Sequence, residues 1–138
     1  MSRSYRSTLI LAAFTGAALS SAWAADTQVK LSGQEETPPV TTAAAGTATI
    51  SVAADKKVTG SVKTSGVEGT AAHVHAGAPG EKGPPVITLE KGENGTWTIP
   101  AGAQLTDEQY AAYKAGKLYI NIHSAANKGG EIRGQIKP

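Results

Sequence analysis

The chain has 138 residues, no cysteine, and 13 lysine and arginine residues against 11 aspartate and glutamate residues, which gives a net charge of +2. Arg3 and Arg6 account for this excess, so the chain after them is neutral and lacks the basic surface that binding to nucleic acid or an anionic membrane requires. The absence of cysteine excludes disulfide bonds, thiol catalysis and thiolate metal sites.

Residues 1–24 have the order of segments that is typical of a secretory signal peptide. Two arginines are followed by a small, apolar run over residues 8–19, and Ala22-Trp23-Ala24 has the A-x-A pattern of a cleavage site. The apolar run is shorter than the roughly 20 residues that a membrane-spanning helix needs. We therefore predict cleavage after Ala24, one mature domain over residues 25–138 with no transmembrane segment, and a periplasmic or secreted location.

Short runs of alternating polar and apolar residues, separated by Gly, Pro and Asn, make up most of the remaining chain, as is typical of a β-sandwich or barrel. Ala54-Asp55 joins two such runs and predicts a hairpin. Asn94-Gly95 predicts a type I′ hairpin turn because both residues tolerate a positive φ. The predicted strands are Gln28–Ser32, Gly46–Ala53, Lys57–Thr64, Ala71–Ala76, Val86–Glu90, Thr96–Ile99, Leu118–His123 and Glu131–Ile136.

One short helix is predicted to begin at Thr106 and to end just before Gly116. Thr106 and Gln109 have the spacing of a capping box, and glycine is the usual residue just past a helix end. Tyr110 and Tyr113 share one face, which we expect to pack against the sheet. We assign the helix a structural role and no chemistry.

The three histidines lie in two of the predicted strands, and each of these strands is followed by a glycine-rich turn. In "AAHVHA", alternation places His73 and His75 on the face opposite the alanine and valine side chains. In "LYINIH", it places His123 opposite the leucine and isoleucine side chains. If the aliphatic faces pack inward, all three imidazoles lie outside the core, and they meet if the two strands are neighbours.

The geometry of a sheet allows these three imidazoles to bind one metal ion. Residues two apart on a strand are separated by about 6.6 Å and neighbouring strands by about 4.8 Å, within the reach of side chains that bind zinc at about 2.0 Å. Three nitrogen ligands without sulfur suit Cu(II) or Zn(II), with one position left for water or substrate. The predicted metal site is His73, His75 and His123. The alternative interpretation, ordinary polar residues on the solvent face, stays open.

Other candidate motifs carry no complete catalytic set. Ser124 directly follows His123, and strand neighbours point to opposite faces, so these two do not form a nucleophile–base pair. The chain has no G-x-S-x-G elbow, and "GAPGEKGPP" lacks the helix and the Lys-Ser/Thr of a phosphate-binding loop, so it predicts a rigid turn. Glu131 and Arg133 are predicted to form a surface ion pair, with support for His123 as the alternative.

Three stretches of the sequence resemble the chordin-type (CHRD) domain family: "LSGQEETPPVTTAAAGTATISV", "AAHVHAGAPGEKGPPV" and "LYINIHSAANKGGEIRGQI". They follow one another in the family's order, and the resemblance as a whole extends from Lys30 to Ile136. The resemblance implies that residues 25–138 are a CHRD domain, exported and often standing alone in bacteria. It implies an all-β, antiparallel, immunoglobulin-like Greek-key sandwich of about seven or eight strands, with one short helix. In chordin itself, the domain accompanies growth-factor-binding modules.

A second, local similarity is to copper–zinc superoxide dismutase, whose copper site also uses an H-V-H strand. His73 and His75 match that motif, and His123 is a candidate counterpart of a later histidine in that family. The chain has no fourth histidine for such a copper site, no histidine that bridges to zinc, and no cysteine for the family's disulfide. These departures count against dismutase activity.

Together these features favour an exported CHRD-type protein that binds rather than catalyses. The predicted ligand is a divalent transition metal, with copper favoured and zinc as the second choice, held by His73, His75 and His123. The alternative prediction is an interaction module that recognises a protein or a component of the cell envelope and has no metal role. No nucleic-acid partner is expected.

Overall fold

The computed structural model describes residues 25–138, so the signal peptide predicted for residues 1–24 lies outside the described residues. The described residues form nine strands, one α-helix and one 3-10 helix. The strands are β1 (Thr27–Ser32), β2 (Ala45–Val52), β3 (Val58–Ser65), β4 (Gly69–Ala76), β5 (Pro85–Thr88), β6 (Glu90–Lys91), β7 (Thr96–Thr98), β8 (Leu118–Ser124) and β9 (Ile132–Ile136). The helices are η1 (Gly33–Glu35) and α1 (Asp107–Lys114).

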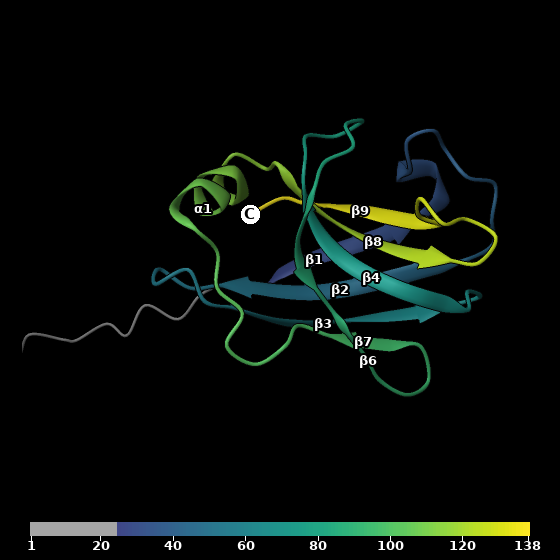
Figure 1. The fold of residues 1–138 in the computed structure, drawn as a ribbon, viewed down its shortest axis with the longest axis horizontal. Helices are drawn as coiled ribbons and strands as arrows, with labels where there is room; N and C mark the ends of the chain where they lie inside the picture. The colour runs from purple at the N-terminus through teal and green to yellow at the C-terminus, as the bar shows by residue number, and fades with distance from the viewer. Residues whose placement is uncertain (1–24) are drawn as a thin grey trace, which may run out of the picture.

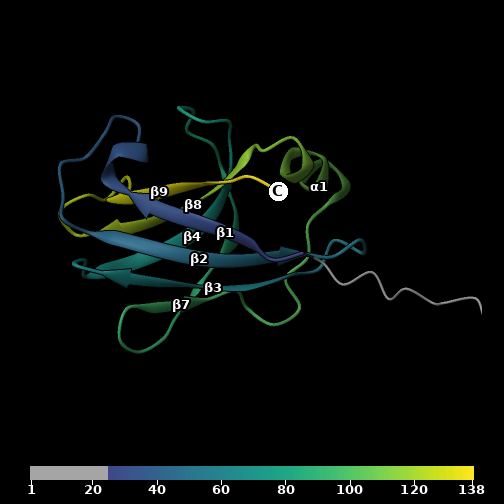
Figure 2. The same cartoon turned by 180° about the vertical axis from the view of Figure 1, so that it is seen from behind.

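All nine strands belong to one antiparallel sheet with the order β5-β4-β8-β9-β1-β2-β3-β7-β6. The two ends of this order come from a single stretch of chain, because β5 pairs with β4 whereas β6, two residues later, pairs with β7. Between them, the backbone N–H of Leu89 donates to the carbonyl of Ala72 at 2.9 Å. The chain therefore passes directly from one end of the strand order to the other, and the molecule is sandwich- or barrel-like, with β4 and β8 on one side and β1 and β2 on the other (Figures 1 and 2).

The core lies between these two sides and is filled by aliphatic side chains from alternate strand positions. Successive residues of a strand point to opposite faces, so on most strands every second side chain enters this core, whereas β8 and β9 are buried on both faces. Trp97 and Tyr113 are the aromatic members of this buried cluster. The largest fully buried side chains are Leu31, Ile50, Leu118, Ile120, Ile122, Ile132, Ile136, Val62 and Val74.

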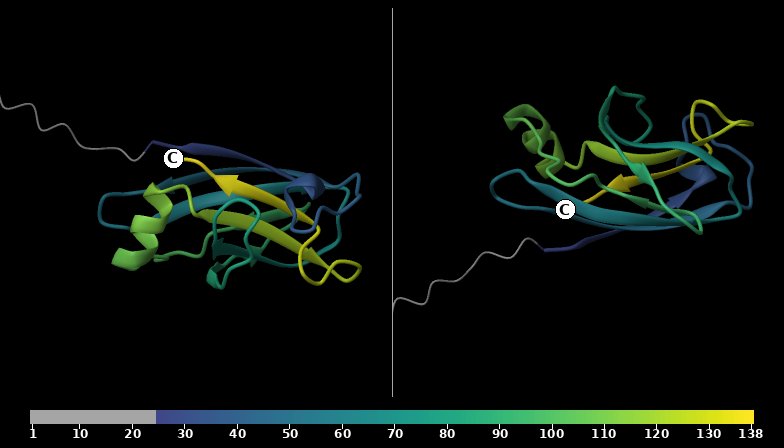
Figure 3. Two further views of the ribbon diagram at one scale, coloured as in Figure 1. Left: turned by 90° about the horizontal axis from the view of Figure 1, so that it is seen from above. Right: turned by 60° about the horizontal axis from the view of Figure 1, so that its bottom comes forward.

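The predicted turns and the predicted helix are confirmed. β2 and β3 form a hairpin around Ala54-Asp55, and Asn94 and Gly95 both have a positive φ, at 55° and 73°. Thr106 and Gln109 form both hydrogen bonds of the capping box at the start of α1. The helix lies at one end of the sheet (Figure 3), and no helix among the described residues is long and apolar enough to cross a membrane.

The all-β, antiparallel fold with one α-helix is also confirmed, and two of its elements were missed from the sequence. The segment predicted as one strand, Val86–Glu90, is two strands, because the chain changes its pairing partner at Leu89. The 3-10 helix η1 has only three residues, too few to produce a periodic pattern. Its carbonyl at Gly33 accepts the backbone N–H of Val40 at 2.8 Å, which folds the chain back over the end of the sheet.

Candidate metal centre

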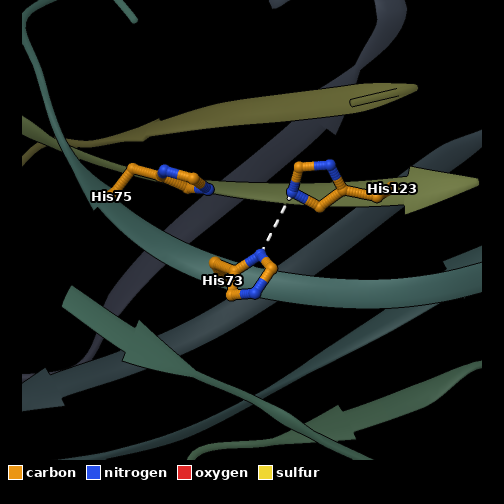
Figure 4. Close-up of side chains that lie close together, drawn as sticks. All are labelled: His73, His75 and His123. Carbon is orange, nitrogen blue, oxygen red and sulfur yellow. Dashed lines mark hydrogen bonds between the residues drawn. The ribbon is translucent and has the colours of Figure 1, made fainter. Parts of the chain in front are cut away.

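The three histidines lie on one face of two neighbouring strands. β4 carries His73 and His75, β8 carries His123, and the two strands pair in antiparallel fashion. Their register places His73 opposite Asn121 and His75 opposite Tyr119. The predicted neighbourhood is therefore confirmed, and the three rings point toward one another from both strands (Figure 4).

The imidazole nitrogens are close enough to share one ion. One ring nitrogen from each histidine lies within 4.8 Å of the corresponding nitrogens of the other two. His73 Nδ1 lies 3.1 Å from His123 Nε2, and the centroids of the His75 and His73 rings are 5.3 Å apart. Nitrogens that bind one ion at about 2.0 Å lie roughly 3.3–3.5 Å from one another, so the His73–His123 pair is already near that spacing and separations of up to 4.8 Å would have to shorten.

Two of the imidazoles are held by backbone carbonyls on their outer side. Nδ1 of His75 donates to the carbonyl of Gly83 at 2.9 Å, and Nδ1 of His123 donates to the carbonyl of Lys128 at 2.8 Å. In the neutral tautomer this bond requires, the proton is on Nδ1 and the lone pair is on Nε2. Histidines that bind metals commonly have this kind of outer hydrogen bond, which fixes the tautomer and the orientation of the ring.

His75 Nε2 is a buried nitrogen whose hydrogen-bonding capacity is unused. It has no hydrogen-bond partner anywhere in the described part of the chain. Burying a polar atom without a partner costs free energy, so such atoms are rare and often mark a binding position. The lone pair of this nitrogen is therefore directed into the cluster and available to a ligand.

Burial lowers the pKa of His73 and the pKa of His75. The neighbouring imidazoles lower both values further, because two positive charges at this separation repel each other. For His75, the hydrogen bond to Gly83 acts in the opposite direction and offsets part of this shift. Both side chains consequently favour the neutral form, which is the form that binds metal ions.

Comparison with protein families matches residues 27–136 to the family described as the CHRD domain. The chain belongs to the CHRD domain family. The match includes both histidine-bearing strands, and membership suggests a binding or interaction module. Comparison with curated proteins and comparison with solved structures each gave no match.

The histidine-bearing face of this CHRD domain is not the open solvent face that strand alternation predicts. All three histidines are partly buried, and Tyr119 and Asn121, on the same face, are only 4% and 2% exposed. The reason is the loop between β4 and β5, whose Gly83 N–H donates to the Tyr119 hydroxyl at 3.1 Å. Tyr119 in turn stacks against the His75 ring, with the centroids 5.0 Å apart and the planes 4° from parallel.

The surface ion pair predicted for Glu131 and Arg133 is wrong. Both side chains are buried, and within residues 25–138 they form no ion pair with each other. Glu131 accepts hydrogen bonds from the side chains of Ser124 and Thr42, at 2.7 and 2.9 Å, which lowers its pKa. Arg133 donates instead to backbone carbonyls of the β4–β5 loop. The two side chains point apart because each forms hydrogen bonds with a different part of the CHRD domain.

Other residues around the cluster were not identified as functional from the sequence. Alternation along β8 placed Tyr119 and Asn121 on the histidine-bearing face, but it does not distinguish a buried polar residue from a solvated one. Glu36 comes from the distant segment after η1 and contacts Asn121 through a bond of 2.9 Å. No local pattern in the CHRD domain sequence predicts that contact, because 85 residues separate the two partners.

Proposed function

We propose that this CHRD domain is an exported binding protein that holds one divalent transition-metal ion, with copper favoured over zinc. The ligands are Nδ1 of His73, Nε2 of His75 and Nε2 of His123. The observation that carries the proposal is the convergence of one ring nitrogen from each histidine within 4.8 Å, with the bonds from Nδ1 of His75 and of His123 fixing the neutral tautomer that has no proton on Nε2.

The chemistry of the ligand set supports copper or zinc over harder ions. Imidazole suits copper and zinc, whereas magnesium and calcium prefer oxygen ligands. Copper is favoured because a given set of nitrogen ligands generally binds Cu(II) more tightly than Zn(II). Three ligands also leave one position free for an exchangeable group.

Metal binding requires one proton to move on His73. In the neutral state, the 3.1 Å contact is a hydrogen bond in which His73 Nδ1–H donates to the Nε2 lone pair of His123. For His73 Nδ1 and His123 Nε2 both to hold a metal ion, the proton of His73 would have to be on its other ring nitrogen, Nε2. This exchange of tautomers leaves the ring neutral.

A purely structural role explains these hydrogen bonds but not the whole cluster. The contacts of His73 with His123 and of His75 with Gly83 do join β4, β8 and the β4–β5 loop. They leave His75 Nε2 buried and without a partner in the described residues, which is a cost that a structural residue would not need to carry. A bound ion satisfies that nitrogen.

Export rests on the order of charged, apolar and small residues over residues 1–24. CHRD family membership is in keeping with an extracellular protein. We infer a periplasmic or secreted location on these grounds.

The proposal is tested by titrating the purified protein with Cu(II), and separately with Zn(II), in a calorimeter. We expect one ion per chain, and we expect His75→Ala to weaken copper binding by more than the roughly 10- to 100-fold that loss of an outer hydrogen bond causes. Lys128→Ala is the matched control, because it keeps the backbone carbonyl that holds His123 and removes only an exposed side chain. Equal copper affinity in the wild type and in His75→Ala would exclude this site.

A further inference from the structure

Asn121 is a buried polar residue on the same face of the sheet as the histidine cluster. It lies between Tyr119 and His123 on the same face of β8, and it is directly opposite His73 in the register with β4. The residue is 2% exposed, and its side-chain oxygen, Oδ1, is buried without a hydrogen-bond partner among residues 25–138. Asn121 Oδ1 and His75 Nε2 are the two buried side-chain atoms of the described chain in this condition.

The orientation of the Asn121 amide is fixed from the other side. Its Nδ2 donates to Glu36 Oε1 at 2.9 Å and approaches the carbonyl of Gly129 at 3.4 Å. A carboxylate and a carbonyl only accept hydrogen bonds, so turning the amide over would place oxygen against oxygen. Gly130 packs so closely on this pair that an added Cβ would collide with Asn121 Nδ2, and its φ of +124° also favours glycine. Oδ1 is therefore held away from Glu36.

The Asn121 side chain also lies beside His75. A hydrogen-bonding interaction with Asn121 acts to raise the pKa of His75, although neither Asn121 Oδ1 nor His75 Nε2 has a partner at ordinary hydrogen-bond distance. Two buried atoms with unused lone pairs thus belong to side chains that are diagonal neighbours on one face of β4 and β8. A buried acceptor of this kind calls for a donor, and the neutral tautomer of His75, which donates from Nδ1 to Gly83, has no proton on Nε2 to supply.

We propose that Asn121 Oδ1 accepts a hydrogen bond from the exogenous ligand on the metal, and that it thereby selects water and other ligands that carry a proton over anions that do not. This inference rests on the proposed function, because it concerns the position that three histidine ligands leave open. A metal-bound water has protons to donate to Oδ1. A proton-free anion such as azide has no proton to donate to Oδ1. Its lone pair would face the lone pairs of Oδ1, so the two would repel each other and the buried oxygen would stay without a hydrogen bond.

Asn121 is a positioning and selecting residue here and not a metal ligand. Copper and zinc take imidazole nitrogen in preference to a neutral amide oxygen, and the cluster already offers three such nitrogens. Removing the amide oxygen should therefore change which exogenous ligand binds, while the affinity for the metal itself changes little.

The test is a titration of the copper-loaded protein with azide, followed through the azide-to-copper charge-transfer absorption. We expect Asn121→Ala to bind azide about tenfold more tightly than the wild type, a change that corresponds to about 1.4 kcal/mol. Copper affinity in the same variant should stay within about threefold of the wild type. Equal azide affinity in the two proteins would overturn the inference.

A second variant keeps the test decisive if Asn121→Ala does not fold. Glu36→Gln retains Asn121 and the shape of its partner, but an amide offers a donor as well as an acceptor, so it no longer fixes the orientation of Asn121. We expect azide affinity to rise by at least about threefold in Glu36→Gln. No rise in this variant would overturn the inference equally.

The outcomes separate this inference from the proposed function. Copper binding that does not depend on His75 would exclude the proposed metal site itself. Copper binding that depends on His75, combined with azide affinities that do not respond to Asn121 or Glu36, keeps the metal site and removes only the role of Asn121. Lys128→Ala, which leaves the carbonyl beside His123 in place, should match the wild type in both titrations.

Discussion

The three histidines of the cluster have different surroundings, and the differences follow from what each Nδ1 contacts. His75 and His123 each donate from Nδ1 to a backbone carbonyl, whereas His73 Nδ1 faces His123 directly. The rings of His75 and His123 are therefore held by carbonyls outside the cluster, whereas the ring of His73 is held by a contact with another histidine of the cluster. His75 is the most constrained, since it also stacks on Tyr119.

The lowered pKa values of His73 and His75 predict that stability depends on pH. Each of these groups binds a proton more readily in the unfolded chain, whose imidazoles have a pKa near 6.5, than in the folded protein. The stability of the metal-free protein should therefore be unaffected by these groups well above pH 6.5 and should fall as the pH drops below it. The loss should end once the pH is below the lowered pKa values. Urea unfolding at pH 7.5, 6.5 and 5.5 measures this change.

His75→Ala is the variant that isolates this contribution. It removes one of the two shifted groups, so its stability should depend less on pH over the same range than that of the wild type. The comparison is needed because burial raises the pKa of Glu36. Protonation of Glu36 therefore favours the folded protein as the pH falls, which opposes the loss of stability caused by the histidines. A wild type and a variant with identical pH dependence would contradict the assigned shift.

At the scale of elements, the β4–β5 loop and the end of β9 determine how the cluster is held. Arg133 on β9 donates to the carbonyls of Ala78 and Glu81, at 3.0 and 2.6 Å, and lies 3.4 Å from the centroid of the Tyr119 ring. Tyr119 on β8 thus lies between Arg133 and His75, which belong to the flanking strands. The loop that provides the carbonyl partner of His75 is therefore anchored two strands away from it.

Replacing Arg133 by methionine should loosen this loop and weaken metal binding. The variant removes the Arg133 donor from both carbonyls, and although Ala78 keeps the backbone N–H of Glu81 as a donor, the loop loses its ties to β9, so the backbone amides of residues 77–84 should exchange with solvent faster. Because Gly83 then holds His75 less firmly, we expect copper affinity to fall about 10- to 100-fold. Hydrogen exchange and copper titration on the same sample provide the two measurements.

Glu81→Ala is a suitable control for the Arg133 variant. Its side chain bonds only the Ala78 N–H, at 3.2 Å, and the carbonyl that Arg133 binds is kept. It should therefore change copper affinity much less. Faster exchange in the loop with unchanged copper affinity in Arg133→Met would show that the loop does not position His75.

Local patterns predicted the elements well and the surroundings of the site poorly. The capping box of α1, the turn at Asn94-Gly95 and the face carrying His73 and His75 all depend on residues close together in the chain. The bond from Asn121 to Glu36 and those from Arg133 to the β4–β5 loop span 85 and more than 50 residues. Their partners are set by how the strands assemble, and no spacing within one segment encodes that.

At the scale of the whole molecule, the site exists only in the folded chain. His73 and His123 are 50 residues apart in the sequence and meet only because β4 pairs with β8. The unfolded chain retains the H-x-H pair alone, which is a weaker ligand than three converging imidazoles. A metal ion that binds here must therefore stabilise the fold.

This linkage predicts a rise in melting temperature on adding metal. Free Cu(II) at about 100 times its dissociation constant should add about 2.7 kcal/mol to the free energy of unfolding, if binding to the unfolded chain is negligible. For a domain of this size, that corresponds to a shift on the order of 10 °C. Scanning calorimetry of the wild type and of His123→Ala, with and without copper, measures the shift, which the variant should largely lose. An equal shift in both would mean that copper stabilises the protein from another position.

The short ends of the sheet also limit how this molecule contacts other copies of itself. An open sheet presents long rows of unpaired backbone groups along which a second chain can add and start an aggregate. Here the two ends of the strand order are only four and two residues long, and β5 begins with Pro85, which has no N–H to offer. The domain thus presents only short strand edges to which a second chain could add.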